Sequence, residues 1–142
     1  MWEETTDIDK KSASEIEIFQ TTALQKHLEY IRNNSPYYQS VFKDNKIDVA
    51  SIKSIADLTK IPTTTKEDLE RKNTDFICVD REQIVEYVTT SGTLGKPITI
   101  ALTREDIDRL AHNEKRSLLM AGVTNLDTVQ ITTTLDKMFM AG

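Results

Sequence analysis

The stretch "TTSGTLGKP" gathers the residue types that hold anionic oxygen atoms. The chain has only four glycines, and two of them, Gly92 and Gly95, lie in this stretch. Glycine lets backbone amides approach a phosphate closely because no Cβ stands in the way. The hydroxyls of Ser91 and Thr93 add donors, and the Lys96 ammonium adds a positive charge. The pattern therefore indicates a phosphate-binding loop.

Two other interpretations of the same stretch have to be weighed. A Walker A loop, GxxxxGK[ST], would need glycine at Thr90 and a hydroxyl residue at Pro97, and it would lead into a helix. This stretch meets none of these conditions. A plain hairpin turn remains open, because two glycines also serve a connection that needs positive φ angles. The residues alone leave the turn and the phosphate loop as alternatives.

The segments on both sides of the loop predict how it is held. Residues 84–89 and 97–102 are rich in β-branched side chains and read as two strands. Thr103, with an acidic residue three positions on, predicts the start of a helix that runs to about residue 121, and Gly122 suits its C-terminal cap. Residues 127–135 predict a further strand. The expected inner face of the helix comprises Ile107, Leu110, Ala111, Leu118 and Ala121.

The first seventy residues predict short, well-capped helices. Ser12 and Glu15 have the capping-box spacing and open a helix over 13–33. Ser35 followed by Pro36 opens a second helix, and later caps are expected at Ser54 and at Thr64 or Thr65. The apolar stripe of the first helix comprises Ile16, Phe19, Ala23, Leu24, Leu28 and Ile31, and the second helix contributes Tyr37, Tyr38, Val41 and Phe42 to the core.

These elements predict an α/β fold with an α+β character at its N-terminus. Residues 1–74 form a mainly helical lead, and residues 75–142 form strand, loop, strand, helix and strand, the beginning of a larger sheet. Such a sheet has too few strands to cover its own edges. We therefore expect the N-terminal portion, residues 1–142, of a longer protein.

Composition narrows the function classes. A net charge of -5 and a pI near 5.1 argue against nucleic-acid binding. No apolar run approaches the roughly 18 residues of a membrane span. Cys78 is the single cysteine, expected as a small buried thiol, and His27 and His112 are too isolated to predict a metal site. These features predict a cytoplasmic protein.

The loop and its flanks resemble the adenylate-forming superfamily, in its phenylacetate–coenzyme A ligase branch. "YVTTSGTLGKPITIALT" is similar to that branch's phosphate motif, TSGTTGKP. "LQKHLEYIRNNSPYYQSVF", "SIADLTKIPTTTKEDL" and "LTREDIDRLA…AGV…DTVQI" resemble its N-terminal region in order and spacing. The resemblance begins near Ser14 and spans about the first third of a complete family member, with the small C-terminal domain absent.

The resemblance implies that this loop grips the β- and γ-phosphates of ATP. The residues carried over are Thr90, Ser91, Gly92, Thr93, Leu94, Gly95 and Lys96. Leu94 departs from the family, which has threonine or serine there, so one hydroxyl donor is lost while the backbone amides remain. The lysine that other branches place after the proline is replaced by Ile98.

The family's chemistry then supplies the expected reaction. A carboxylic acid, an aryl acid by the family's namesake, attacks ATP to give an acyl-adenylate, and coenzyme A accepts the acyl group. ATP, Mg²⁺ and coenzyme A are the implied cofactors of the longer protein, and a homodimer is an open alternative. The catalytic lysine and the metal ligand are expected beyond residue 142, so this fragment alone is expected to be inactive.

Two alternatives stay open. An adenylate-forming enzyme with another acceptor, a protein thiol or a deazaflavin cofactor, would share every feature above. A non-catalytic helical interaction module would use the glycines only as a turn.

Overall fold

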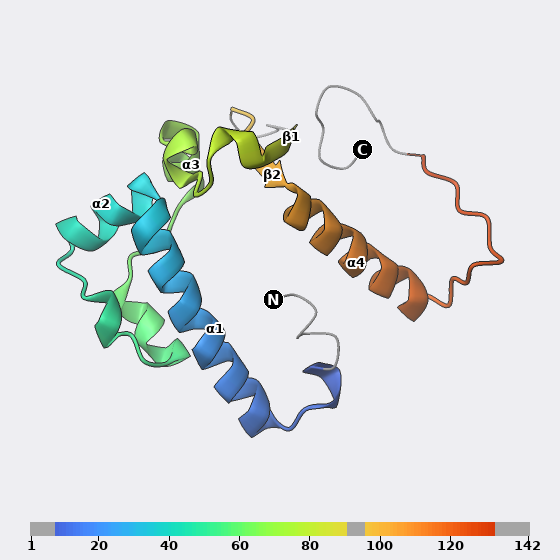
Figure 1. Cartoon of the computed structure of the whole chain (residues 1–142), viewed down its shortest axis with the longest axis horizontal. Coiled ribbons are helices and arrows are strands. Elements are labelled where there is room, and N and C mark those ends of the chain that lie inside the picture. Colours follow the sequence, from blue (N-terminus) through green and yellow to red (C-terminus); the bar gives the residue numbers. More distant parts are fainter. Residues whose placement is uncertain (1–7, 91–95, 133–142) are drawn as a thin grey trace. The chain divides into compact units, whose positions relative to one another are not determined.

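A computed structural model describes residues 8–90 and 96–132 of the chain. It divides into two compact units, Met1–Cys78 (unit 1) and Val79–Gly142 (unit 2), which are coloured blue to green and green to red in Figure 1. Unit 1 is helical, and unit 2 holds the strands. Within the described ranges, no helix has both the length and the apolar character needed to cross a bilayer.

Unit 1 is a series of helices with short connections. Its first long helix, α1, covers Ala13–Asn34, and α2 covers Pro36–Asp44. The helix predicted over 13–33 is therefore confirmed, and so is the Ser35 cap with Pro36 in the first turn of α2. The shorter helices are η2 (Ile8–Lys10), η3 (Val49–Ser51), η4 (Ile55–Lys60), α3 (Lys66–Arg71) and η5 (Asn73–Phe76).

Local hydrogen bonds explain where these helices begin. The Ser12 amide donates to a Glu15 carboxylate oxygen at 2.8 Å, and the Glu15 amide donates back to the Ser12 hydroxyl at 3.4 Å. Thr65, one of the two predicted caps, forms the same reciprocal pair with Asp68 at the start of α3. Each pair satisfies amides that the first helical turn leaves unbonded.

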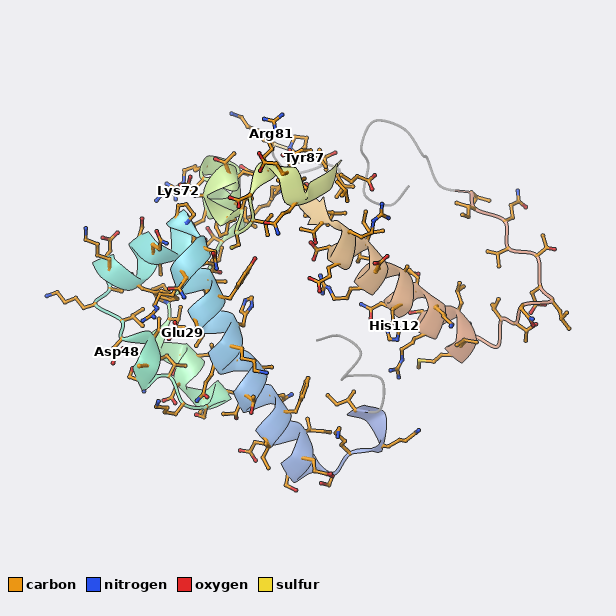
Figure 2. All side chains as sticks on the ribbon, viewed as in Figure 1. Glu29, Asp48, Lys72, Arg81, Tyr87 and His112 are labelled. Atoms are coloured by element: carbon orange, nitrogen blue, oxygen red, sulfur yellow. The ribbon has the colours of Figure 1, made fainter. Side chains whose placement is uncertain are left out.

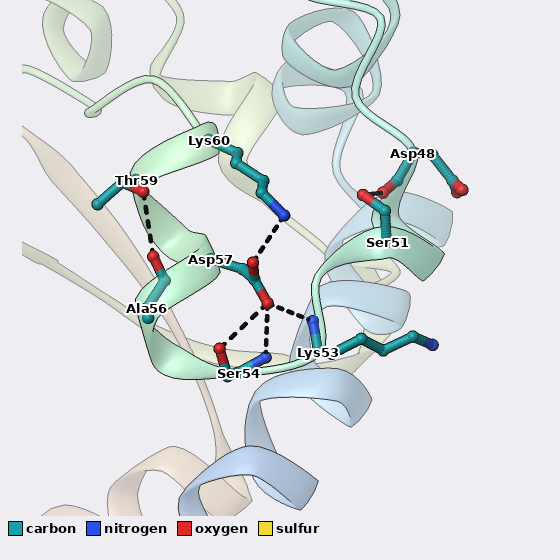
Figure 3. A network of polar contacts seen from close by, with 8 residues as sticks. All are labelled: Asp48, Ser51, Lys53, Ser54, Ala56, Asp57, Thr59 and Lys60. Carbon is teal, nitrogen blue, oxygen red and sulfur yellow. Dashed lines mark hydrogen bonds and ion pairs between the residues drawn. The ribbon is translucent and has the colours of Figure 1, made fainter.

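The η4 turn is held by a single carboxylate, drawn in Figure 3. Asp57 accepts from the Lys60 ammonium at 2.6 Å, from the Lys53 amide at 2.9 Å and from the Ser54 amide at 3.0 Å. The Lys60 contact, followed by the Lys53 amide, holds the pKa of Asp57 well below its usual range. The carboxylate therefore stays ionised and keeps the turn closed near neutral pH.

The core of unit 1 lies where α1 meets α2 and the segment after it. It comprises the buried side chains Leu28, Ile31, Phe42, Val49 and Ile52. Of the predicted α1 stripe, Leu28 and Ile31 are buried and Leu24 packs against the core, whereas Ala23 is exposed. Ile16 and Phe19 are half-buried, so among the described residues the stripe is fully buried only toward its C-terminal end.

Ser35 and the aromatic side chains fix the end of unit 1. The Ser35 side chain is fully buried, donates to the Asp75 carbonyl at 3.0 Å and accepts from the Tyr38 amide at 3.4 Å. The Tyr37 ring stacks on Phe76 with centroids 4.0 Å apart. These contacts join the α1–α2 corner to η5, forty residues later in the chain.

Unit 2 consists of a short helix, a hairpin and a long helix. Helix η6 (Arg81–Gln83) leads into β1 (Ile84–Thr89), which pairs antiparallel with β2 (Thr99–Thr103) and is followed by α4 (Arg104–Met120). The strand–loop–strand–helix order predicted from the sequence is confirmed. Gly122 has a φ of 84°, the left-handed conformation expected after the helix.

Two expectations for unit 2 are corrected by the structure. Residues 127–132 form no strand, and the rest of the predicted strand lies outside the described residues. On α4 the predicted inner face is largely uncovered: Ile107 is half-buried, but Leu110 and Leu118 are 38% and 41% exposed. Both differences have one physical cause, because a strand needs a neighbouring strand and an apolar helix face needs a surface to cover it. The described residues supply neither.

Candidate functional site

The connection between β1 and β2 joins an antiparallel hairpin whose register is regular next to the connection and shifts only at its far end, between Ile84 and Glu86. The register pairs Thr89 with Thr99 and Val88 with Ile100, next to the connection. Val88 on β1 and Leu102 on β2 are buried, at 8% and 9% exposure, so packing holds one side chain of each strand. The strands therefore fix both ends of the connection.

Thr90 closes the base of the connection. Its amide donates to the Ile98 carbonyl at 3.0 Å, and the Ile98 amide donates to the Thr90 hydroxyl oxygen at 3.0 Å. The Ile98 side chain is itself buried, at 9% exposure. Both bonds join the two ends of the connection, and we call this bonded pair the neck of the connection.

The structure describes only the two ends of the predicted site. Ser91, Gly92, Thr93, Leu94 and Gly95 lie outside the described residues. Thr90 is half-buried at the neck, and Lys96 is exposed on the opposite arm of the loop. No ion pair joins Lys96 to another described residue. Its ammonium is thus available, within that part of the chain, to an anion from solution.

Ile98 has a role in the site that the sequence pattern does not predict. The pattern places it in the strand expected over 97–102 and marks it as a departure from the lysine of other branches, and the structure adds that its buried side chain and its amide bond to Thr90 hold the neck. The signal was present as an apolar residue directly after Pro97, at the expected start of a strand. The position serves packing and loop closure in this chain.

Asp106, the acidic residue in the first turn after β2, already has hydrogen-bond partners. The Thr103 amide and hydroxyl donate to Asp106 at 3.0 and 2.8 Å, and Arg109 lies at 3.4 Å. Partial burial raises the pKa of Asp106, but the Thr103 bonds and the Arg109 charge outweigh it, so the pKa is lowered overall. This carboxylate caps α4 and is not free to act as a base.

Cys78 and His112 are two further side chains whose chemistry could matter for a site. Burial raises the pKa of the Cys78 thiol, which is half-buried and therefore less reactive. His112 lies on α4, as Figure 2 shows. Across residues 8–90 and 96–132, no three histidine, cysteine or acidic side chains come together as a metal site would require.

Comparison with known proteins gives consistent matches. The chain is 35% identical over 126 residues to phenylacetate-coenzyme A ligase of Escherichia coli K12, which covers 87% of this chain and 29% of that protein. The ligase of the same name from Aromatoleum evansii is also 35% identical over 126 residues and is covered to 28%. Protein CapK of Staphylococcus aureus is 28% identical over 90 residues. No protein-family model matches the sequence.

Solved structures show the same fold. A 2-hydroxyisobutyryl-CoA ligase in complex with 2-HIB-AMP and CoA aligns with a TM-score of 0.72 at 24% identity, covering 79% of this chain and 25% of that one. A second structure of that ligase, in its postadenylation state, aligns with a TM-score of 0.71. The chain therefore has the fold of part of an α/β adenylate-forming ligase, and it spans less than a third of the length of the relatives it matches.

Proposed function

This chain is homologous to the phenylacetate-coenzyme A ligases, and we propose that it supplies the nucleotide phosphate loop of an AMP-forming acid–thiol ligase. The observation that carries the proposal is the hairpin neck between Thr90 and Ile98. It holds a glycine-containing loop at the ends of two paired strands, with Lys96 exposed on one arm. A loop fixed at its neck can present several amides toward one anion.

The reaction has two balanced steps. A carboxylate oxygen of the acid attacks the α-phosphorus of ATP, the bond from that phosphorus to the bridging oxygen breaks, and pyrophosphate leaves. The sulfur of coenzyme A then attacks the acyl carbon, the bond to the AMP oxygen breaks, and the thiol proton is lost to solvent. The mixed anhydride is needed because a free carboxylate is a poor acyl donor.

The part played by this chain is to bind and orient the leaving group. Amides of Gly92 and Gly95, with the hydroxyls of Ser91 and Thr93, would donate to the β- and γ-phosphates. Negative charge grows on pyrophosphate as the α-phosphorus bond breaks, so the Lys96 ammonium would stabilise the transition state more than the ground state. Leu94 contributes its backbone amide only.

Mg²⁺ accompanies ATP in reactions of this class, but the described residues do not form a site for it. We assign no residue of this chain to the metal. An aryl acid as substrate, a cytoplasmic location and a homodimer are further parts of the proposal. They rest on the resemblance in sequence and on composition.

The test uses a chimera in which this chain replaces the matching segment of the Escherichia coli ligase. Exchange of labelled pyrophosphate into ATP, in the presence of phenylacetate, measures the first step. We expect Lys96→Ala to slow this exchange by about a hundredfold, the size of effect that loss of one preorganised donor or charge produces. Lys115→Ala, an exposed lysine on α4, is the matched control and should leave the rate unchanged.

Undiminished exchange by the Lys96→Ala chimera would remove this lysine from the mechanism. A screen of acids and acceptors for AMP release then separates the alternatives. Release that depends on coenzyme A supports the ligase, whereas release that depends on a protein thiol or a deazaflavin supports another acceptor. Absence of exchange with every acid, in a chimera that folds, supports the non-catalytic module.

A further inference from the structure

The two hydrogen bonds between Thr90 and Ile98 depart from those of a regular strand pair. In an antiparallel ladder, two residues that face each other as a hydrogen-bonded pair exchange both main-chain bonds. The Thr90 amide donates to the Ile98 carbonyl at 3.0 Å as in a ladder, but the Ile98 amide donates to the Thr90 hydroxyl oxygen, also at 3.0 Å. A side-chain oxygen has therefore taken the place of the Thr90 carbonyl. The ladder that pairs Thr89 with Thr99 ends on this side chain.

The Thr90 hydroxyl suits this position because of its chemistry and not only its shape. The Ile98 amide belongs to a residue that is only 9% exposed, and an amide in such surroundings needs an acceptor. The hydroxyl has two acceptor positions and one donor hydrogen, and Ile98 uses one of the acceptor positions. Valine has nearly the shape of threonine but no acceptor, so it would leave this amide without its partner.

The arm of the hairpin that this bond holds bears Lys96. Pro97 follows Lys96 and has no amide hydrogen, so it cannot donate a bond across the hairpin. The Ile98 amide is thus the first main-chain donor after Lys96. Because this amide is bonded to Thr90, the end of β1 sets the place from which the exposed Lys96 side chain extends.

We infer that Thr90 is a positioning residue, whose hydroxyl ends the ladder and holds the backbone behind Lys96. This inference rests on the proposed function for the role of Lys96, and it gives Thr90 a different part from the phosphate contact that the family resemblance implies. Two restraints remain when the hydroxyl is lost: the bond from the Thr90 amide and the buried Ile98 side chain. Loss of the hydroxyl should therefore cost less activity than loss of Lys96.

Amide hydrogen exchange in the chain tests whether the hydroxyl holds the neck. We expect the Ile98 amide to exchange about tenfold faster in Thr90→Val, because it loses its acceptor, and to recover most of its protection in Thr90→Ser. Thr22→Val is the matched control, since this exposed threonine of α1 bonds only within its own helix, to the Ile18 carbonyl. Equal Ile98 exchange in the native chain and in Thr90→Val would overturn the inference, whether or not the ligase chimera is active.

Energetic coupling between Thr90 and Lys96 tests the positioning role. In the chimera with the Escherichia coli ligase, Thr90→Val should slow pyrophosphate exchange about tenfold when Lys96 is present, and less than about twofold when it is combined with Lys96→Ala. Thr90→Ser should restore most of the rate. A merely structural role would give the same loss in both backgrounds, and that result would overturn the inference.

An ester at position 98 separates positioning from direct phosphate contact. Incorporation of the α-hydroxy acid analogue of isoleucine replaces the Ile98 amide by an ester, which removes the donor and leaves the Thr90 hydroxyl in place. We expect about the same loss of pyrophosphate exchange as in Thr90→Val, and little further loss when the two changes are combined. A rate close to that of the unmodified chimera would show that the hydroxyl acts on phosphate itself, and it would overturn the inference.

The failure of this inference is distinguishable from the failure of the proposed function. Pyrophosphate exchange that depends on Lys96 but not on Thr90 would retain the proposed function and overturn the positioning role. Absence of exchange in a chimera that folds would overturn the proposed function and, with it, the role given to Lys96. The Ile98 amide in the chain would then still report whether the Thr90 hydroxyl ends the ladder.

Discussion

Unit 1 and unit 2 contrast in how far each one covers its own apolar residues. Unit 1 surrounds Leu28, Ile31 and Phe42 with helices that lie within the same unit. Unit 2 buries Val88, Ile98 and Leu102 at the hairpin but leaves much of the α4 face exposed. Stability is therefore concentrated in unit 1, whereas the candidate site lies in unit 2. Among the described residues, unit 1 thus encloses a core of its own, whereas unit 2, which carries the candidate site, leaves the apolar side chains of α4 exposed.

The largest expected effect on the free energy of unfolding comes from removing a large buried side chain from the core of unit 1. Phe42 is 5% exposed, and Phe42→Ala should lower the free energy of unfolding by about 3–5 kcal/mol. Leu118→Ala, at 41% exposure on α4, should change it by less than about 0.5 kcal/mol in the chain alone. Urea unfolding followed by circular dichroism measures both. Similar losses for the two variants would break the contrast between the units.

The next largest effect tests the buried Ser35 side chain, whose hydrogen bonds join the α1–α2 corner to η5. Ser35→Ala removes the donor to the Asp75 carbonyl and the acceptor for the Tyr38 amide. Because the serine is fully buried, we expect a loss of about 1–3 kcal/mol in urea unfolding. Ser40→Ala, whose exposed hydroxyl bonds to the Pro36 carbonyl within α2, is the control and should cost much less.

A smaller effect is expected at the junction of the hairpin and α4. Thr103→Ala removes the hydroxyl that accepts from the Asp106 amide at 3.2 Å, and it should cost about 1 kcal/mol. Exchange of α4 amides reports this loss locally. Faster exchange in α4 with unchanged exchange in α1 would sharpen the contrast, whereas equal changes in both helices would argue that the units unfold together.

The same junction predicts a pH dependence. The pKa of Asp106 is lower in the folded chain than in the unfolded one, so its ionised form contributes stability above the unfolded pKa of about 3.9. That contribution is lost as the pH falls through the folded pKa. The stability difference between the native chain and Asp106→Asn should therefore be present at neutral pH and shrink in acid. A difference that grows below the unfolded pKa would have the wrong sign.

The smallest expected effect concerns the candidate site itself. Lys96 is exposed and forms no ion pair with another described residue, so Lys96→Ala should change the free energy of unfolding by less than about 0.5 kcal/mol. Thermal unfolding checks this value. A loss above about 1 kcal/mol would mean that the lysine has a structural partner and that its effect on rate cannot be assigned to phosphate binding.

The sequence predicted the elements whose signals are local. The capping pairs at Ser12 and Thr103 placed two helix starts correctly, and Thr65, one of the two caps considered for α3, placed a third, because a cap needs only residues within one turn. The β-branched run of β1 and the positive φ of Gly122 were likewise readable from neighbours in the chain. Family, fold class and ligase homology followed from blocks around the glycine loop, and the comparisons support them.

The features that failed depend on distant partners. The strand expected at 127–135 needs a neighbour that periodicity cannot supply, and residues 127–132 form no strand. Ala23 fits an apolar stripe, yet it is exposed among the residues that the structure describes. Closure of the loop by Thr90 and Ile98 was also invisible, since it depends on hairpin register. Phosphate contacts by Ser91, Gly92, Thr93, Leu94 and Gly95 stay a prediction.

The most direct test of the phosphate loop uses the scarcity of glycine. Labelling glycine with ¹⁵N gives a spectrum of only four residues, of which Gly92 and Gly95 lie in the loop and Gly122 lies after α4. Titration with inorganic pyrophosphate, with and without Mg²⁺, should shift the Gly92 and Gly95 amide signals and leave Gly122 in place. Lys96→Ala should weaken the shifts. Unchanged Gly92 and Gly95 signals at saturating pyrophosphate, in both the chain and the chimera, would contradict the central claim that this loop binds the nucleotide's terminal phosphates.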